Sequence, residues 1–459
     1  MKLTSLNPHD QSVVGELEIS TRKDVLEAVA KAKEAFKIWR TISIKNRAEY
    51  LQKYSQLLVA NREKLAMLIT LEMGKPLKEA IGEINDEIDF INYYCERAPE
   101  YLADEVVLTK NKESYRMTYE PYGVCACIVP WNFPLMMADS GILPALLAGN
   151  TVVLKPSEHC SLSQKMIFEL LTETNLPQGV INLVIGNGEV GKMLVEAPID
   201  LVWFTGSTKV GQKIFKKCGE KFIKALLEMG GSSPGIVFAD ADFGLTMDNL
   251  FEARFFNCGQ VCSAVKRLVV EKAIFEKVVE SFTEKLKKVK IGNPMNNPDF
   301  GPLVSQKQLQ TLKRQVADAV KKGAKREIGG KQPEGSEFEK GNYFEPTILT
   351  NINFEMKIWK EETFGPVLPI IPFETEEEAI AIANNTEYGL SAEIYTTDIE
   401  KAERIAKRLE DGTVAINTDN YFKPQCPFGG FRKSGMGREY GRVGLQEFSQ
   451  IKVLAVSKP

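Results

Sequence analysis

The stretch LVWFTGSTKVG at residues 201–211 indicates the fold class of this chain. Leu201–Phe204 is a short apolar run of the kind expected of a buried strand. A Gly-Ser turn follows it, and Val210–Cys218 then carries apolar residues at helical spacing. A strand that enters a helix through such a turn is the repeating unit of a parallel α/β sheet. The helix N-terminus is also a place for a phosphate, although the usual G-x-G-x-x-G fingerprint is absent.

The same alternation extends on both sides of this unit. Strand-like runs and helical stretches alternate upstream, at Val124–Val129, Thr151–Leu154, Leu162–Thr174 and Val180–Ile185. A second alternating block begins at Gly235–Phe238 and continues to about Ala415. We therefore predict two α/β units, with a junction near Gly230–Pro234. Three helical stretches precede the first unit, at Asp24–Trp39, Asn46–Met73 and Leu77–Tyr101.

The composition excludes several classes of protein. The chain has 459 residues, more than one core commonly holds, so we expect at least two domains. The hydrophobic fraction of 44% and the charged fraction of 26% are those of a globular protein. The net charge of -3 gives no reason to expect nucleic acid or a membrane as a partner. The eight Cys are scattered, and no secretory signal precedes them, so we expect reduced thiols and a cytoplasmic protein.

Three residues have the surroundings that covalent catalysis needs. Cys262 follows Gly and Gln in NCGQVC, where small neighbours allow a substrate to approach, although most Cys are buried packing residues. Glu228 lies between apolar residues and two Gly, where desolvation would make it a general base, although it could be an exposed helix-terminal Glu. Asn132, held between two prolines in PWNFP, could donate to an oxyanion or form a rigid turn.

Seven motifs, taken in order, resemble those of the aldehyde dehydrogenase superfamily, from about residue 5 to about residue 455. They are PWNFP (130–134), KPSE (155–158), FTGSTKVG (204–211), LEMGG (227–231), GQVC (259–262), EETFGPV (361–367) and PFGGFRKSGMGRE (427–439). The short N-terminus and the segment CSAVKR resemble the shorter bacterial succinate-semialdehyde dehydrogenases.

The resemblance implies a role for each of these residues. Cys262 would be the nucleophile, Glu228 the base that activates the deacylating water, and Asn132 the oxyanion donor. Enzymes of the superfamily that use coenzyme A generally lack this Glu, so a free acid is the expected product. The expected cofactor residues are Trp131, Lys155, Ser157, Glu158, Gly206, Ser207, Gly211, Glu362 and Phe364. No metal is expected.

The resemblance also implies the cofactor and the architecture. NAD is expected rather than NADP, because a carboxylate at Glu158 would repel a 2′-phosphate. We expect a Rossmann-type NAD-binding domain at 1–107 and 128–232 and an α/β catalytic domain at 233–439. A small β oligomerisation arm at 108–127 and 440–459 would then make a homodimer or homotetramer.

The aldehyde itself is harder to predict. A Lys stands four residues after the nucleophile in the succinate-semialdehyde enzymes that CSAVKR resembles, so we expect Lys266 to hold a substrate carboxylate. The alternatives are a solvent-facing or structural Lys266, and another aliphatic or amino-aldehyde as substrate.

Cys258 would share a helical face with Cys262, which would allow a redox disulfide, unless it is a packing residue.

Two other classes of protein remain as alternatives. The chain could be a non-catalytic binding or structural relative, although Cys262, Glu228 and Asn132 are all present. A cysteine hydrolase without cofactor would need a His base, and neither His9 nor His159 is near Cys262 in the sequence.

Overall fold

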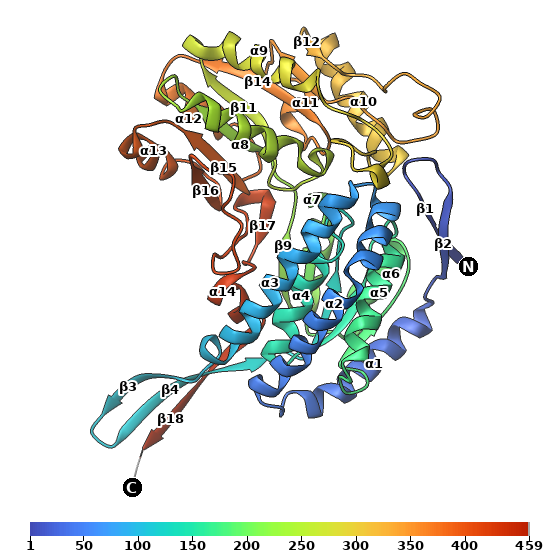
Figure 1. The fold of residues 1–459 in the computed structure, drawn as a ribbon. Helices are drawn as coiled ribbons and strands as arrows, with labels where there is room; N and C mark the ends of the chain where they lie inside the picture. Colours follow the sequence, from blue (N-terminus) through green and yellow to red (C-terminus); the bar gives the residue numbers. More distant parts are fainter. Residues whose placement is uncertain (458–459) are drawn as a thin grey trace.

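The computed structural model describes residues 1–457. Two helix-covered sheets lie one above the other in Figure 1, and a small third sheet extends away from them. None of the helices within residues 1–457 has the length and apolar content of a membrane span.

The first large sheet has six strands in the order β17-β9-β8-β5-β6-β7. Its strands are β5 (Val124–Ile128), β6 (Thr151–Lys155), β7 (Ile181–Leu183), β8 (Leu201–Thr205), β9 (Lys224–Glu228) and β17 (Gly435–Met436). All neighbours are parallel except β17, which runs antiparallel to β9. The sequence predicted β5 to β8 to within three residues at each end.

Helices bury both faces of this sheet, because its strands are apolar throughout. Cys125 and Cys127 of β5 face one core, and Val124, Ala126 and Ile128 face the other. The first core includes α2 (Ile44–Met73), α3 (Leu77–Tyr101), α4 (Met136–Ala148) and α5 (Ser161–Glu173). The second includes α1 (Arg22–Trp39), α6 (Gly188–Glu196) and α7 (Thr208–Lys221). Continuous apolar strands are typical of parallel sheets with two covered faces.

The second large sheet has seven strands in the order β12-β13-β14-β11-β10-β15-β16. They are β10 (Ser233–Val237), β11 (Val265–Glu271), β12 (Lys325–Ile328), β13 (Thr347–Thr350), β14 (Val367–Phe373), β15 (Ser391–Tyr395) and β16 (Thr413–Ile416). One face packs on α8 (Phe243–Phe255), α9 (Phe275–Leu286) and α10 (Gln306–Lys321). The other packs on α12 (Glu376–Ala383) and α13 (Ile399–Ala406). The short α11 (Lys357–Lys360) contributes to both cores.

A connection of four residues, Met229–Ser232, joins the two sheets, because β9 ends at Glu228 and β10 begins at Ser233. This is the junction that the sequence predicted. After β16 the chain returns to the first sheet, where Gly435 of β17 pairs with Glu228. The catalytic domain was expected to run from residue 233 to residue 439, but the structure differs near its end. Strand β17 hydrogen-bonds to the six-stranded sheet rather than to the seven-stranded one.

The third sheet has the order β18-β4-β3, with β3 (Glu105–Lys110), β4 (Glu113–Pro121) and β18 (Ser449–Ser457). It protrudes at the lower left of Figure 1 and corresponds to the expected arm. The arm is smaller than expected at two places. Residues 124–127 belong to β5 in the six-stranded sheet, and α14 (Gly441–Gln446) packs on α3 and α4. Residues 458–459 of the expected arm lie outside the described residues.

Smaller elements complete the chain. A hairpin of β1 (Lys2–Leu6) and β2 (Val13–Glu18) begins it. The 3₁₀ turns are η1 (Phe256–Gly259), η2 (Lys272–Ile274), η3 (Pro294–Asn296) and η4 (Arg432–Ser434).

Candidate active site

Cys262 lies on the loop between η1 and β11, on the seven-stranded side of the junction. Asn257, Cys258 and Gly259 before it all have positive φ, of 52°, 56° and 69°. Left-handed backbone is strained at Asn257 and Cys258, which are not glycines, and tertiary contacts must hold it there. A Cβ at Gly259 would collide with the carbonyl of Gly365, so the loop also needs a glycine there.

The expectation that Cys258 and Cys262 share a helical face is wrong. The left-handed residues replace the α-helical turn that this expectation required. Cys258 packs inside the core of the seven-stranded unit, whereas Cys262 packs against the core of the six-stranded one. The packing reading of Cys258 therefore holds, and the structure gives no support to a disulfide with the nucleophile.

Asn132 is tied directly to this loop. Its Nδ2 donates to the carbonyl of Gln260 at 3.1 Å. Asn257 Nδ2 donates in turn to the carbonyl of Asn132 at 2.9 Å. An amide nitrogen carries two hydrogens, so the second N–H of Asn132 is available for a bound oxygen. PWNFP and the nucleophile loop are thus held in a fixed relation by hydrogen bonds.

Glu228 ends β9 and is 3% exposed. Neither oxygen of its carboxyl has a hydrogen-bond partner. Burial, and then the nearby Glu439, raise the pKa of Glu228 well above its usual range, while Arg438 opposes them. The carboxyl lies beside Gly429, where a Cβ would come within 2.7 Å of Oε1. Glu228 lines neither of the two cavities that adjoin Cys262.

Two large cavities meet at Cys262. The strand-end cavity, of about 990 Å³, lies at the carboxyl ends of β5, β6 and β8, from which Ile128, Lys155 and Thr205 line it. The second cavity, of about 1180 Å³, lies between α3, α8 and residues 419–425. Cys262 and Met137 line both. A molecule in either cavity can therefore reach the thiol.

The strand-end cavity brings together eight of the nine expected cofactor residues. These are Trp131, Lys155, Ser157, Glu158, Gly206, Ser207, Glu362 and Phe364. Lys155 Nζ lies 3.8 Å from Glu158 Oε2. Ser207 is the N-cap of α7, so the positive end of a 14-residue helix opens on this cavity. Carboxyl ends of parallel strands at a change of strand order are where α/β sheets bind nucleotides, so the residues present fit a dinucleotide.

Gly211 is the exception among the expected cofactor residues. It does not line the strand-end cavity. A Cβ on it would collide with the sulfur of Met229, so its bare backbone lets α7 approach the six-stranded sheet. The structure thus places Gly211 against Met229 rather than on the wall of this cavity.

The second cavity is acidic, and we call it the acidic cavity. Its carboxyl groups are those of Glu79, Glu83, Asp86, Asp89, Glu252, Asp299, Glu393, Asp419 and Glu439, against the ammonium groups of Lys78 and Lys423. Burial raises the pKa of Glu79 to about 7 and that of Glu393 and Glu439 to about 8. Glu393 and Glu439 are therefore mostly protonated at neutral pH and Glu79 about half, so the negative charge comes mainly from the more exposed carboxylates.

Aromatic rings form much of the remaining wall of the acidic cavity. They belong to Phe90, Tyr93, Phe133, Phe251, Phe255, Phe256, Phe300, Tyr421, Phe422 and Phe428. Phe90 stacks on Phe422 with ring centres 5.5 Å apart, and Phe133 on Phe256 at 6.0 Å. Sequence reasoning missed this wall and its acids, because the residues come from distant segments with no shared motif.

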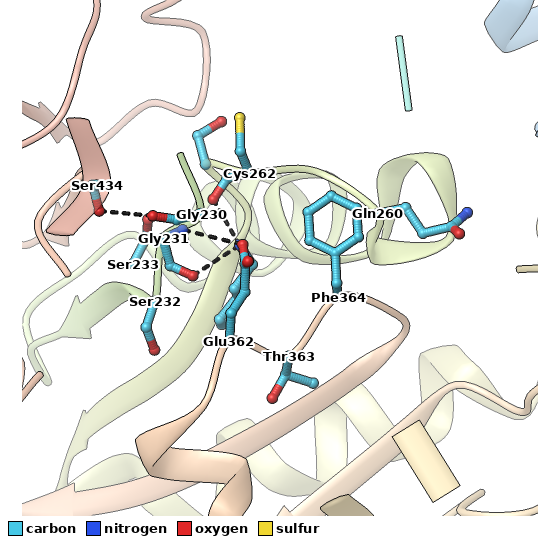
Figure 2. A network of polar contacts seen from close by, with 12 residues as sticks. Gly230, Gly231, Ser232, Ser233, Gln260, Cys262, Glu362, Thr363, Phe364 and Ser434 are labelled. Atoms are coloured by element: carbon cyan, nitrogen blue, oxygen red, sulfur yellow. Dashed lines mark hydrogen bonds and ion pairs between the residues drawn. The ribbon is translucent and has the colours of Figure 1, made fainter. Parts of the chain in front are cut away.

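Lys266 does not have the surroundings expected of a carboxylate anchor. Its side chain is 1% exposed and lines neither cavity. Its ammonium donates to the carbonyls of Gly231 and Cys262 and to Glu362 Oε1, which uses all three N–H bonds. We therefore withdraw the expectation that Lys266 holds the substrate. Figure 2 shows the Glu362 side chain directed toward Gly231, close to Cys262 and Phe364.

Comparisons with known proteins agree with this site. Residues 1–454 match the aldehyde dehydrogenase family. Betaine aldehyde dehydrogenase of Bacillus subtilis is 39% identical over 97% of this chain and 92% of its own length. The mitochondrial succinate-semialdehyde dehydrogenase of Arabidopsis thaliana is 38% identical over 98% of this chain and 85% of its own. The NADP(+) succinate-semialdehyde dehydrogenase GabD of Escherichia coli is 36% identical over 98% and 93%.

A solved structure has the same fold over the whole chain. It is betaine aldehyde dehydrogenase of Staphylococcus aureus in complex with NAD+, which is 35% identical and superposes with a TM-score of 0.96. The match covers 100% of this chain and 92% of that one. Together with the cavities that meet at Cys262, these likenesses establish that the chain belongs to the aldehyde dehydrogenase family.

Proposed function

We propose that this enzyme oxidises an aldehyde to the free carboxylic acid with NAD as hydride acceptor, through a thioester on Cys262. The observation that carries the proposal is the position of Cys262 where the strand-end and acidic cavities meet. One cavity would hold the coenzyme and the other the aldehyde, with the thiol between them.

In the first step the Cys262 thiol would give up its proton to water, and the thiolate sulfur would attack the aldehyde carbon. Burial raises the pKa of this thiol to about 12, and the neighbouring Lys266 ammonium opposes the rise. The aldehyde oxygen gains negative charge as the C–S bond forms. The free N–H of Asn132 and the backbone N–H of Cys262 would hold it, and such a donor contributes about 10²–10³ in rate.

The residues of the strand-end cavity would hold NAD, which would supply a hydride acceptor, a chemistry that belongs to the cofactor rather than to any side chain. Lys155 and Glu158 would bind the adenosine ribose, and Ser207 with the α7 N-terminus the pyrophosphate. Glu362 and Phe364, on the segment after α11, would bind the nicotinamide ribose and ring.

Glu228 would then take a proton from the water that hydrolyses the thioester. Only its ionised form can do so, and burial favours the neutral form. Hydrolysis should therefore become faster as the pH rises through the raised pKa of this carboxyl.

The acidic cavity favours an aldehyde that carries a positive charge, such as an amino- or trimethylammonio-aldehyde. Half-buried Asp419 and the exposed carboxylates would attract a cation, and the aromatic wall would stabilise it through cation–π contacts. The names of two relatives, which act on betaine aldehyde, agree with this preference.

Succinate semialdehyde, which the sequence favoured, is the second candidate. The observation for it is that the relatives from Arabidopsis thaliana and Escherichia coli carry this name. Against it, the only cations that line the acidic cavity among the described residues are Lys78 and Lys423, and both are exposed.

The third sheet supports the proposal that the chain forms a homodimer or homotetramer. Its edge strands β3 and β18 expose Val106, Val107, Ile451 and Val453. Open strand edges with apolar side chains are surfaces on which a second copy could add strands.

Replacing the nucleophile gives the first test. Cys262→Ala should abolish NADH formation with every aldehyde while NAD binding stays nearly unchanged, because the thiol forms the covalent bond but does not hold the cofactor. Steady-state assays and calorimetric titration with NAD measure the two quantities. Substantial NADH formation by this variant would contradict the mechanism, and Cys426→Ala, which changes an exposed thiol, is the matched control.

The role of Glu228 has its own kinetic signature. Glu228→Gln should keep a burst of one NADH per site and lower the later steady-state rate by about 10²–10⁴, because an amide cannot take the proton of water. The increase of the native steady-state rate with pH should also disappear. Stopped-flow absorbance between pH 6 and pH 9 measures both, and an equal loss of burst and steady state would place Glu228 in an earlier step.

A panel of aldehydes tests the substrate class. We expect kcat/KM to be highest for betaine aldehyde and 3-aminopropanal, lower for butanal and lowest for succinate semialdehyde. Asp419→Asn should reduce kcat/KM for the cationic aldehydes by about 10-fold or more and leave butanal unchanged, since a charge-assisted contact contributes about 1.5–3 kcal/mol. Glu400→Gln, an exposed site outside the cavity, is the control. A preference for succinate semialdehyde would make the second candidate the better one.

The coenzyme preference depends on Glu158. The native enzyme should have a higher kcat/KM with NAD than with NADP, because this carboxylate would repel a 2′-phosphate. Glu158→Ser should lower the NAD/NADP ratio by about tenfold, which corresponds to about 1.4 kcal/mol. Glu189→Gln, at another acid of the same cavity, is the matched control. A native preference for NADP would overturn the assignment.

A further inference from the structure

Lys266 joins three segments that are distant in the sequence. It is the second residue of β11, and its Nζ lies 2.9 Å from the carbonyl of Gly231, 2.7 Å from that of Cys262 and 2.6 Å from Glu362 Oε1. The three acceptors belong to the connection between the sheets, to the nucleophile loop and to the segment after α11. The ammonium therefore lies where both halves of the site meet.

A purely structural role does not account well for this arrangement. A buried ion pair pays a desolvation cost and is often no more stabilising than apolar residues of similar volume. The next residue provides a contrast. Arg267 points to the other side of β11 and donates only to the carbonyls of Ser232, Ile382 and Ala383, none of which lines either cavity. Arg267 thus links segments that lie outside both cavities, whereas Lys266 contacts Cys262 and Glu362, which line them.

Contacts to both oxygens fix the position of the Glu362 carboxylate. Its Oε1 accepts from the N–H of Gly231 at 3.1 Å as well as from Lys266. Its other oxygen packs on the bare backbone of Gly230, where a Cβ would collide with it. Lys266 Nζ also lies 5.3 Å from the centre of the Phe364 ring. Glu362 and Phe364 both line the strand-end cavity, whereas Lys266 does not. Lys266 therefore contacts two residues of the cavity wall without lining the cavity itself.

We propose that Lys266 is a positioning residue that holds Glu362 ready for the nicotinamide ribose and keeps a positive charge on the backbone of Cys262. The inference rests on the proposed function, in which Cys262 is the nucleophile and Glu362 a coenzyme contact. In this proposal Lys266 does not bind the substrate but holds a coenzyme contact in place. It also couples coenzyme binding to the reactivity of the thiol.

The charges that face the thiol determine the sign of the effect. Burial raises the pKa of Cys262, and the carboxyls of Glu439, Glu362 and Glu228 raise it further, whereas Lys266 lowers it. The charge of Lys266 is itself supported by Glu362 against burial and against the like charge of Arg254. Loss of the ammonium should raise the pKa of the thiol. Loss of the Glu362 charge should not, provided that the Lys266 ammonium stays charged through its bonds to the carbonyls of Gly231 and Cys262.

The test uses two variants with opposite expected effects on the thiol. In Lys266→Met, the rate of Cys262 alkylation by iodoacetamide at pH 8 should fall about tenfold, and its pH profile should move to higher pH. In Glu362→Gln the profile should stay or move to lower pH. Both variants should bind NAD about tenfold more weakly, as calorimetric titration measures. Lys266→Arg should keep most of the native thiol profile, and Lys272→Met, an exposed lysine beyond β11, should change nothing.

The outcomes separate this inference from the proposed function. Alkylation is followed on the Cys262 peptide by mass spectrometry in the native oligomer without aldehyde, so it needs no turnover. A folded Lys266→Met variant with native thiol profile and NAD affinity would overturn the inference, whatever its activity. Should Lys266→Met fail to fold, a native NAD affinity in Glu362→Gln would overturn it. An active Cys262→Ala variant would instead overturn the proposed function and leave the measured thiol shift as it is.

Discussion

The connection Met229–Ser232 is the constraint on which the rest of the site depends. It is the direct link between the two large sheets, and five hydrogen bonds from other segments hold it. Ser434 donates to Gly230 and accepts from Met229, Lys266 donates to Gly231, Gly231 donates to Glu362, and Arg267 donates to Ser232. Figure 2 shows how closely these segments converge. Any movement between the sheets would therefore displace the loop of Cys262 and the Glu362 wall of the strand-end cavity together.

Glycine makes this convergence possible. Side chains at Gly230 and Gly231 would collide with Glu362 and with the backbone of Cys262, so neither position tolerates a Cβ without a shift. The left-handed residues before Cys262 are likewise held by contacts from elsewhere, such as the bond from the Asn257 N–H to Glu79. The reactive thiol thus lies on a strained loop whose shape is determined by its neighbours rather than by its own sequence.

Charge is distributed unequally around the thiol. Glu228 and Glu439 are buried with raised pKa values, so burial favours the neutral form of both carboxyls near Cys262. At the strand-end cavity, the Lys266 ammonium offsets the carboxylate of Glu362. The acidic cavity has carboxylates with few cations to offset them. Because the acidic cavity has an excess of carboxylates, we propose that the aldehyde carries a positive charge, rather than a carboxylate that a lysine would bind.

The sequence by itself determined the local elements and the motifs. Helix α3 has the bounds that the spacing of its apolar residues predicted, and strands β5 to β8 of the six-stranded sheet followed from their apolar runs, whereas β9 and β17 were not predicted. The motif residues Asn132, Lys155, Glu158, Cys262 and Glu362 line the cavities as expected, because each is adjacent in sequence to a strand end or a tight turn.

Only the tertiary structure decided which charges meet. Lys266 was expected on the substrate side, but its strand turns the side chain toward Glu362, which is 96 residues away in the sequence. Cys258 was expected beside Cys262, but left-handed backbone places it in another core. Many of the acids and aromatic rings of the acidic cavity come from α3, α8 and the segment near Asp419. Such long-range contacts leave no periodic pattern in the chain, because they depend on how the two sheets pack rather than on the spacing of neighbouring residues.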